Sequence, residues 1–136
     1  MNKKLLIIVA IFLIAVPLSY TFYFSPESKA DRLYYRHYFL CEEHNIDFSK
    51  AGRGEISTEK FLDNERIRLE DYTALLNEAK QLPDTRKNEH LKSMIDYRIK
   101  GTWIVLDMAF TGKINHVALE KEWKKSKQEA DAYLES

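Results

Sequence analysis

The sequence predicts an all-α protein: an N-terminal transmembrane or signal-anchor helix in residues 1–24, followed by a small, mostly antiparallel bundle of about four helices in residues 25–136. Three observations lead to this fold class. Residues 5–24 are apolar and uncharged, apolar residues further along recur at helical spacing, and no stretch alternates with the period of two that marks a strand. The length of 136 residues suits one modest domain plus an anchor.

The uncharged run at residues 5–24 is long enough to cross a membrane. A helix rises about 1.5 Å per residue, so this run reaches about 30 Å, which is the hydrocarbon thickness of a bilayer. Aromatic residues gather at its C-terminal end, where interfacial aromatic side chains anchor membrane helices. Pro17 falls within the run, and membrane helices tolerate proline. We therefore expect residues 5–24 to hold the protein in a membrane.

The charges around this run bear on topology. Lys3 and Lys4 form a short basic segment like those that begin bacterial export signals. We expect a single-pass protein of the inner (cytoplasmic) membrane, with the N-terminus in the cytoplasm and the bundle on the extracytoplasmic side. The alternative is a secreted or periplasmic protein, cleaved after Ala30, because Ser28-Lys29-Ala30 fits the small-x-small rule. The run is longer than the usual signal core of about 7–15 residues, which favours the uncleaved anchor.

The first helix of the bundle has a clear start. Ser25 can cap it, Pro26 suits the first helical position, and an acid follows in the first turn. We expect this helix to run to about His44. Residues 45–57 contain two glycines and no apolar period, so they are predicted to form the longest loop.

The next two helices are predicted to be antiparallel neighbours. Ser57 can cap a helix over about residues 58–82, which Pro83 stops. After a very short turn, one apolar stripe continues through residues 86–111, so we expect a single helix there. The stripe passes through Gly101 without a change of phase, and we expect this small residue to mark close contact with another helix. The stripe consists of Leu91, Ile95, Ile99, Thr102, Trp103, Leu106 and Phe110.

The last helix is predicted to begin after Gly112, with Asn115 as its N-cap. Asp107, just before this turn, falls on the polar side of the preceding helix, and we expect it to be solvated. The apolar side of the last helix consists of Leu119, Trp123, Ala130 and Tyr133.

The first bundle helix carries the pattern most suggestive of chemistry. His37, Cys41 and His44 are spaced i, i+4 and i+7, so they share one side of the helix. Imidazole and thiolate are ligands for zinc, copper and haem iron, and a metal- or haem-binding envelope protein is the alternative function. We favour packing, because a single helix rarely supplies three ligands and no Cys-x-x-Cys-His motif is present. No cofactor is therefore expected.

The opposite side of the same helix suggests contact with a protein. Arg32, Tyr35, Arg36 and Phe39 lie there together, and exposed aromatic residues with arginine are typical of binding hot spots. The alternative is that these side chains touch another helix or the membrane interface.

Composition excludes several other functions. The 21 basic and 21 acidic residues balance, which gives no basis for nucleic-acid binding. A single cysteine excludes an intramolecular disulfide, and no catalytic constellation is visible. We expect a membrane-tethered extracytoplasmic domain, not an enzyme. It would bind a protein partner as an accessory, inhibitor or immunity-type factor, or as a subunit of an envelope complex.

Overall fold

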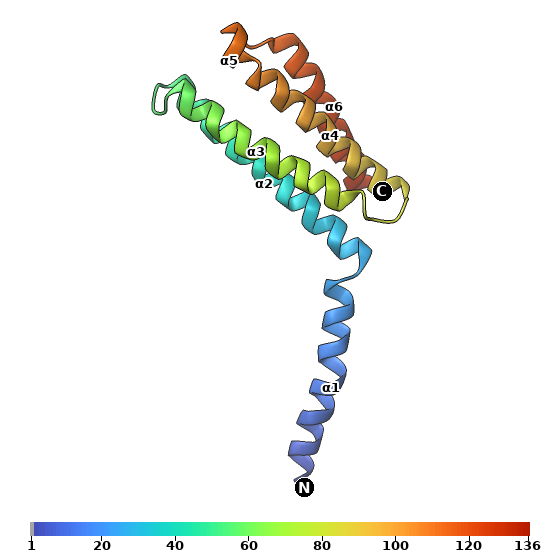
Figure 1. Ribbon diagram of the computed structural model, residues 1–136. Coiled ribbons are helices and arrows are strands. Elements are labelled where there is room, and N and C mark those ends of the chain that lie inside the picture. Colours follow the sequence, from blue (N-terminus) through green and yellow to red (C-terminus); the bar gives the residue numbers. More distant parts are fainter. Residues whose placement is uncertain (1) are drawn as a thin grey trace.

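The computed structural model describes residues 2–136, and within them every element is an α-helix, as expected (Figure 1). An isolated N-terminal helix precedes a bundle of antiparallel helices, so the predicted all-α fold is confirmed. The elements are α1 (Lys3–Tyr23), α2 (Pro26–Gly52), α3 (Thr58–Ala79), α4 (Arg86–Leu106), α5 (Met108–Thr111) and α6 (His116–Glu135).

Helix α1 projects away from the bundle as a separate rod (Figure 1). No residue of Lys3–Tyr23 is buried against the rest of the protein. This helix is long and apolar enough to cross a membrane or to act as a signal sequence. Pro17 lies inside the helix, and the hydroxyl of Thr21 donates a 2.9 Å hydrogen bond to the Pro17 carbonyl. The apolar surface of α1 therefore has no partner within residues 2–136.

Three of the four long helices of the bundle begin at the caps predicted from the sequence, Ser25, Ser57 and Asn115, and α4 begins at Thr85. Ser25, Ser57, Thr85 and Asn115 each accept a hydrogen bond from the backbone N–H three residues further on. Such a bond satisfies one of the unpaired donors at a helix start and typically stabilises the helix by about 1 kcal/mol.

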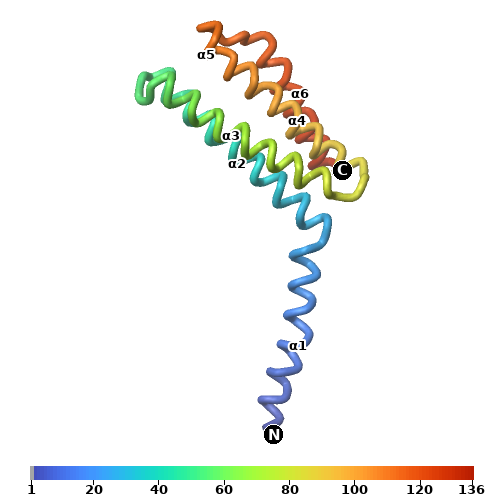
Figure 2. Tube along the Cα trace, in the orientation of Figure 1, coloured from blue at the N-terminus to red at the C-terminus, as the bar shows by residue number. Residues whose placement is uncertain are grey.

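The helices pack around two apolar clusters. Helix α4 is central, because it packs extensively on both α3 and α6, and α2 packs mainly on α3. One cluster, around Tyr72, Leu91 and Tyr133, lies towards the end of the bundle that joins α1, which we call the proximal end. The other, around Phe61 and Leu119, lies towards the opposite, distal end. The tube in Figure 2 places the C-terminus at the proximal end, near the α3–α4 turn.

The predicted loop over residues 45–57 is wrong, because α2 continues to Gly52. No helix-breaking residue lies between His44 and Gly52, and contacts with α3 hold this segment in the helix. Asp47 accepts hydrogen bonds from two α3 side chains, and the Phe48 ring lies 5.9 Å from that of Phe61. Only the short connection between Gly52 and Thr58 remains, and it turns at Gly54, where φ is +71°.

The single helix predicted over residues 86–111 is also wrong, because it breaks at Asp107 into α4 and α5. Asp107 is exposed, as expected. Trp103 and Phe110 were predicted to lie on the buried apolar side of this helix, but they are 59% and 90% exposed. The buried side of α4 at this end is formed instead by Thr102, Val105 and Leu106. Gly101 does mark a close approach, since a Cβ there would lie 2.5 Å from Nε1 of the Trp123 indole.

Candidate functional site

The structure brings His37 and Cys41 together and gives His44 a different partner. The Cys41 sulfur lies 3.8 Å from both ring nitrogens of His37, so it does not point at either nitrogen in particular. The same sulfur accepts a 3.6 Å hydrogen bond from the Tyr72 hydroxyl. Nδ1 of His44 lies 2.8 Å from Oε1 of Glu65 on α3. Within residues 2–136, no group of three or more His, Cys, Asp or Glu side chains is arranged to hold a metal ion.

Burial sets the protonation of these groups. Loss of hydration, helped by the nearby Arg98 guanidinium, lowers the pKa of His37 to about 3, so its ring is neutral at neutral pH. Burial also lowers the pKa of His44, against the opposing effect of Glu65. For Cys41, burial raises the thiol pKa, which keeps the sulfur protonated and makes it a poor nucleophile.

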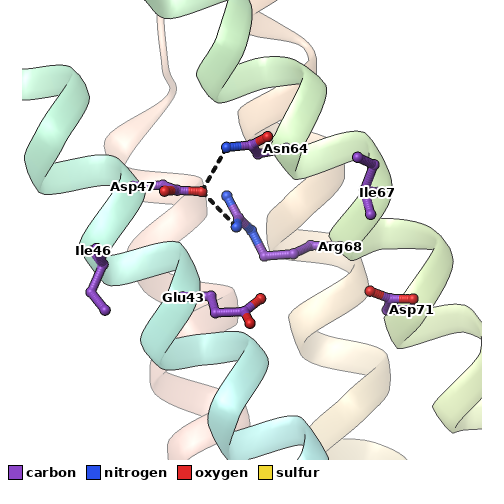
Figure 3. A pocket seen from close by; sticks show the side chains of 7 residues that line it. All are labelled: Glu43, Ile46, Asp47, Asn64, Ile67, Arg68 and Asp71. Carbon is purple, nitrogen blue, oxygen red and sulfur yellow. Dashed lines mark hydrogen bonds and ion pairs between the residues drawn. The ribbon is translucent and has the colours of Figure 1, made fainter. Parts of the chain in front are cut away.

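A buried polar network joins α2 to α3 around Arg68, whose side chain is 6% exposed. Its Nη1 donates to Oδ2 of Asp47 at 2.7 Å, and its Nε donates to Oε1 of Glu65 at 2.7 Å. Asn64 donates to the same Asp47 oxygen at 3.0 Å (Figure 3). Burial alone would raise the pKa of Glu65, but hydrogen bonds from His44 and Arg68 hold it below its usual range. The Arg68 charge is therefore paired with two carboxylates, and its Nη2, which makes no hydrogen bond, lies 2.6 Å from Oε1 of Glu65.

A shallow groove of about 310 Å³ covers this network on the outer side of α2 and α3 (Figure 3). Its lining residues are Glu43, Ile46, Asp47, Asn64, Ile67, Arg68 and Asp71. Three carboxylates against one guanidinium give the lining a formal charge of −2. Ile46 and Ile67 are more than half exposed. The groove thus combines negative charge with exposed aliphatic surface.

The four residues expected to bind a protein do not form one free patch. Tyr35 and Phe39 are exposed, as that interpretation requires. Arg36 pairs at 3.0 Å with Glu78 of α3. Arg32 turns back to α1: its Nη1 donates to the Tyr23 carbonyl at 2.6 Å, and its guanidinium lies 4.2 Å from the centre of the Tyr23 ring. Arg32 is therefore part of the α1–α2 joint.

Sequence reasoning missed Ile46 because it placed this residue in a loop. In the observed helix, Ile46 follows Phe39 by seven residues, close to two full turns, so the two lie on one line. Tyr35, Phe39 and Ile46 are 57%, 62% and 53% exposed. We call these three residues the apolar stripe. Extending the phase of the helix past His44 would have found its third member.

A second hollow, of about 300 Å³, lies in the seam between α2 and α6, with α4 at its floor. His37 and Cys41 line it from α2, Trp123 and Lys127 from α6, and Arg98 from α4. We call it the seam cleft. Sequence reasoning missed Arg98, although this residue lies seven positions after Leu91 and four before Thr102, in phase with the buried stripe of α4.

Comparison with known proteins finds no relative: no family model matches the chain, and neither a curated protein nor a solved structure does.

Proposed function

We propose that this protein is a single-pass, membrane-tethered helical domain of the cell envelope that binds a protein partner through the outer side of α2. The partner contact would serve an accessory, inhibitory or immunity-type role, or membership of an envelope complex. The observation that carries the proposal is the apolar stripe. Two aromatic residues and an isoleucine lie in line and more than half exposed on one helix, whereas soluble domains rarely leave such side chains grouped without a use.

The surroundings of the apolar stripe support a partner of defined chemistry. The acidic groove lies beside Ile46, and Ile67 extends the exposed aliphatic surface across it onto α3. Aromatic residues such as Tyr35 and Phe39 dominate binding energy at interfaces, and a charged rim adds specificity and speeds association. A partner with apolar side chains next to Lys or Arg would complement this surface.

The proposed topology places the N-terminus in the cytoplasm and the bundle outside. The basic pair Lys3 and Lys4 and the uncovered apolar surface of α1 support it. The bundle uses residues that cleavage after Ala30 would remove, and this supports retention of the anchor. Ser25 caps α2, and Ala30 is buried in the proximal cluster. Cleavage after Ala30 would remove both.

We do not propose the metal- or haem-binding alternative, because His44 is engaged with Glu65 and no observation favours a metal ion at His37 and Cys41. Near-stoichiometric zinc, copper or iron in the purified chain, lost in His37→Ala, would favour it instead.

A photo-crosslinking amino acid at position 39, in cells expressing the full chain, tests the proposal. We expect one dominant protein adduct, identified by mass spectrometry, which Ile46→Lys reduces at least tenfold. Phe110 is the matched control, because it is an aromatic residue 90% exposed at the distal end, outside the stripe. Equal crosslinking at positions 39 and 110, or none at position 39, would contradict the proposal.

A further inference from the structure

We propose that the seam cleft binds a small organic monocarboxylate, whose carboxylate group pairs with Arg98 and whose apolar part lies among the side chains of α2 and α6. This ligand site is separate from the apolar stripe on the outer side of α2 and does not depend on it.

The two buried arginines of the bundle differ in one respect. Arg68 and Arg98 are 5% and 8% exposed, so both are more than nine-tenths buried. Arg68 is paired with Asp47 and Glu65. Within residues 2–136, no carboxylate oxygen lies within 4.0 Å of the Arg98 guanidinium nitrogens. Proteins rarely keep a charge buried without a partner, because its lost hydration must be compensated.

The contacts that Arg98 does make leave the outer part of its guanidinium free. Its Nε donates to the Tyr72 hydroxyl at 3.3 Å, and its guanidinium carbon lies 4.3 Å from the centre of the Trp123 ring. Neither Nη nitrogen makes a hydrogen bond to residues 2–136, and Nη2 is buried without a partner. Nη2 of Arg68 also lacks a hydrogen bond, but it lies 2.6 Å from Oε1 of Glu65, whereas no carboxylate of the described residues lies near Nη2 of Arg98. Two adjacent Nη donors in one plane match the two oxygens of a carboxylate, and binding through both would require the lining to open over Nη2, which is buried in this structure.

Nothing else in the seam cleft neutralises Arg98. Burial and Arg98 lower the pKa of His37, so that ring is neutral at neutral pH. The Cys41 thiol, whose pKa burial raises, is protonated there. Glu42 and Lys127 also line the cleft, but both are exposed and their charges cancel. Among the charged residues that line the cleft, one positive charge is therefore left in excess, which a monoanion would balance.

The rest of the lining favours an organic ligand over a bare ion. Tyr34, Met94, Trp123 and Ala130 supply aromatic and aliphatic surface around the charge. The volume of about 300 Å³ lies at the small end of the usual range for ligand pockets. A compact acid with a short aliphatic or single-ring body meets both requirements.

Fluorescence of Trp123 in the full chain, kept in detergent micelles, tests this inference. The chain has two tryptophans, and Trp103→Phe removes the exposed one, so the remaining signal comes from the cleft. The probes are phenylacetate and hexanoate, with phenylacetamide as the neutral isostere and sulfate as the bare anion. We expect saturable quenching or a spectral shift with at least one carboxylate. Binding of phenylacetamide and sulfate should be at least tenfold weaker than that of the responding carboxylate.

Arg98→Met should weaken carboxylate binding about tenfold to a hundredfold, because a hydrogen bond to a charged group is lost. Arg66→Met is the matched control: Arg66 is exposed on α3, and its loss should leave binding unchanged within twofold. Should Arg98→Met fail to fold, the comparison of phenylacetate with phenylacetamide on the parent chain still decides. No response to either carboxylate, equal binding of the amide, or sulfate binding as tightly would overturn the proposal.

Discussion

The hydroxyl of Tyr133 donates a 2.6 Å hydrogen bond to Oδ1 of Asp31, joining the last turns of α6 to the first turns of α2 across 102 residues. The Tyr133 ring is buried and stacks on that of Tyr34, with 5.0 Å between the ring centres. The start of α2 and the end of α6 are thus in direct contact at the proximal end of the bundle. The stability of the whole bundle should therefore depend on a residue close to its C-terminus.

Tyr133→Phe should lower the free energy of unfolding by about 1 kcal/mol through loss of the hydrogen bond. Tyr133→Ala should lower it by about 3–5 kcal/mol, because the buried ring is lost as well. Urea denaturation followed by circular dichroism, on the full chain in detergent, measures both. Leu134→Ala, at an exposed neighbouring position, should change stability by less than about 0.5 kcal/mol. An equally large effect at Leu134 would contradict the role assigned to Tyr133.

Gly101→Ala should destabilise the protein even though alanine favours helices. The new Cβ would lie 2.5 Å from the Trp123 indole nitrogen, and overpacking of this kind costs about 1–3 kcal/mol. The gain in helix propensity is at most about 1 kcal/mol. Gly52→Ala is the control, because no atom lies within 4 Å of its Cβ position, and it should be neutral or slightly stabilising. The denaturant midpoint should fall for Gly101→Ala. It should stay the same or rise slightly for Gly52→Ala.

The two buried arginines should respond differently to the same substitution. Arg68→Met removes the guanidinium that pairs with Asp47 and Glu65, and it should cost about 3–5 kcal/mol. Arg98→Met removes a buried charge that has no carboxylate partner, so without ligand it should cost less than about 1 kcal/mol or be stabilising. Thermal unfolding of the two variants measures the contrast. Equal losses would mean that Arg98 is compensated within the protein.

His37 should make the protein less stable in acid. Burial lowers its folded-state pKa from 6.5 to about 3, so between these values the unfolded chain binds a proton that the folded chain does not. The free energy of unfolding therefore falls as pH falls through this window, by up to about 1.4 kcal/mol per pH unit from this group. Denaturation between pH 7 and pH 4 should show a smaller slope for His37→Phe. His116→Phe, at an exposed position, should keep the parent slope.

The proposed anchor predicts fractionation and topology. The chain should remain in membranes after carbonate or high-salt extraction, because apolar insertion is not screened by ions. Ile11→Lys should release or destabilise it, since a charge at the centre of the span costs about 2.5–3.5 kcal/mol. A reporter fused after Ser136 should be active on the outer side of the membrane. A soluble product starting at Asp31, or a reporter active in the cytoplasm, would contradict the proposed topology.

The parts of the fold that could be predicted from the sequence depend on local signals. Ser25, Ser57 and Asn115 cap helices through bonds that reach only three residues, and they lie where the sequence placed them. The inward side of α2 was predictable for the same reason, because helical phase alone puts His37 and Cys41 on it. These features needed no knowledge of neighbouring helices.

The parts that failed depend on contacts between helices. Asp47 holds residues 45–52 in α2 through Arg68 and Asn64, a pairing that requires the register of α3. The partner of His44 is Glu65, 21 residues away, which spacing within α2 could not indicate. Arg98 was overlooked because an arginine on the buried side of a helix normally has a carboxylate partner. That Arg98 has none within residues 2–136 is visible only once the neighbouring helices are in place.

The joint between α1 and α2 has a consequence for how such a protein would find a partner. Only Phe24 and Ser25 separate the two helices, the Phe24 N–H continues the helical bonding to Tyr20, and Arg32 braces the joint against Tyr23. In a chain anchored through α1, the bundle would be carried stiffly at a short height above the lipid. The apolar stripe starts ten residues beyond Ser25 and ends within about 32 Å of the joint along α2. Encounter would then be a lateral, two-dimensional search, which favours partners that are themselves held at the same membrane surface.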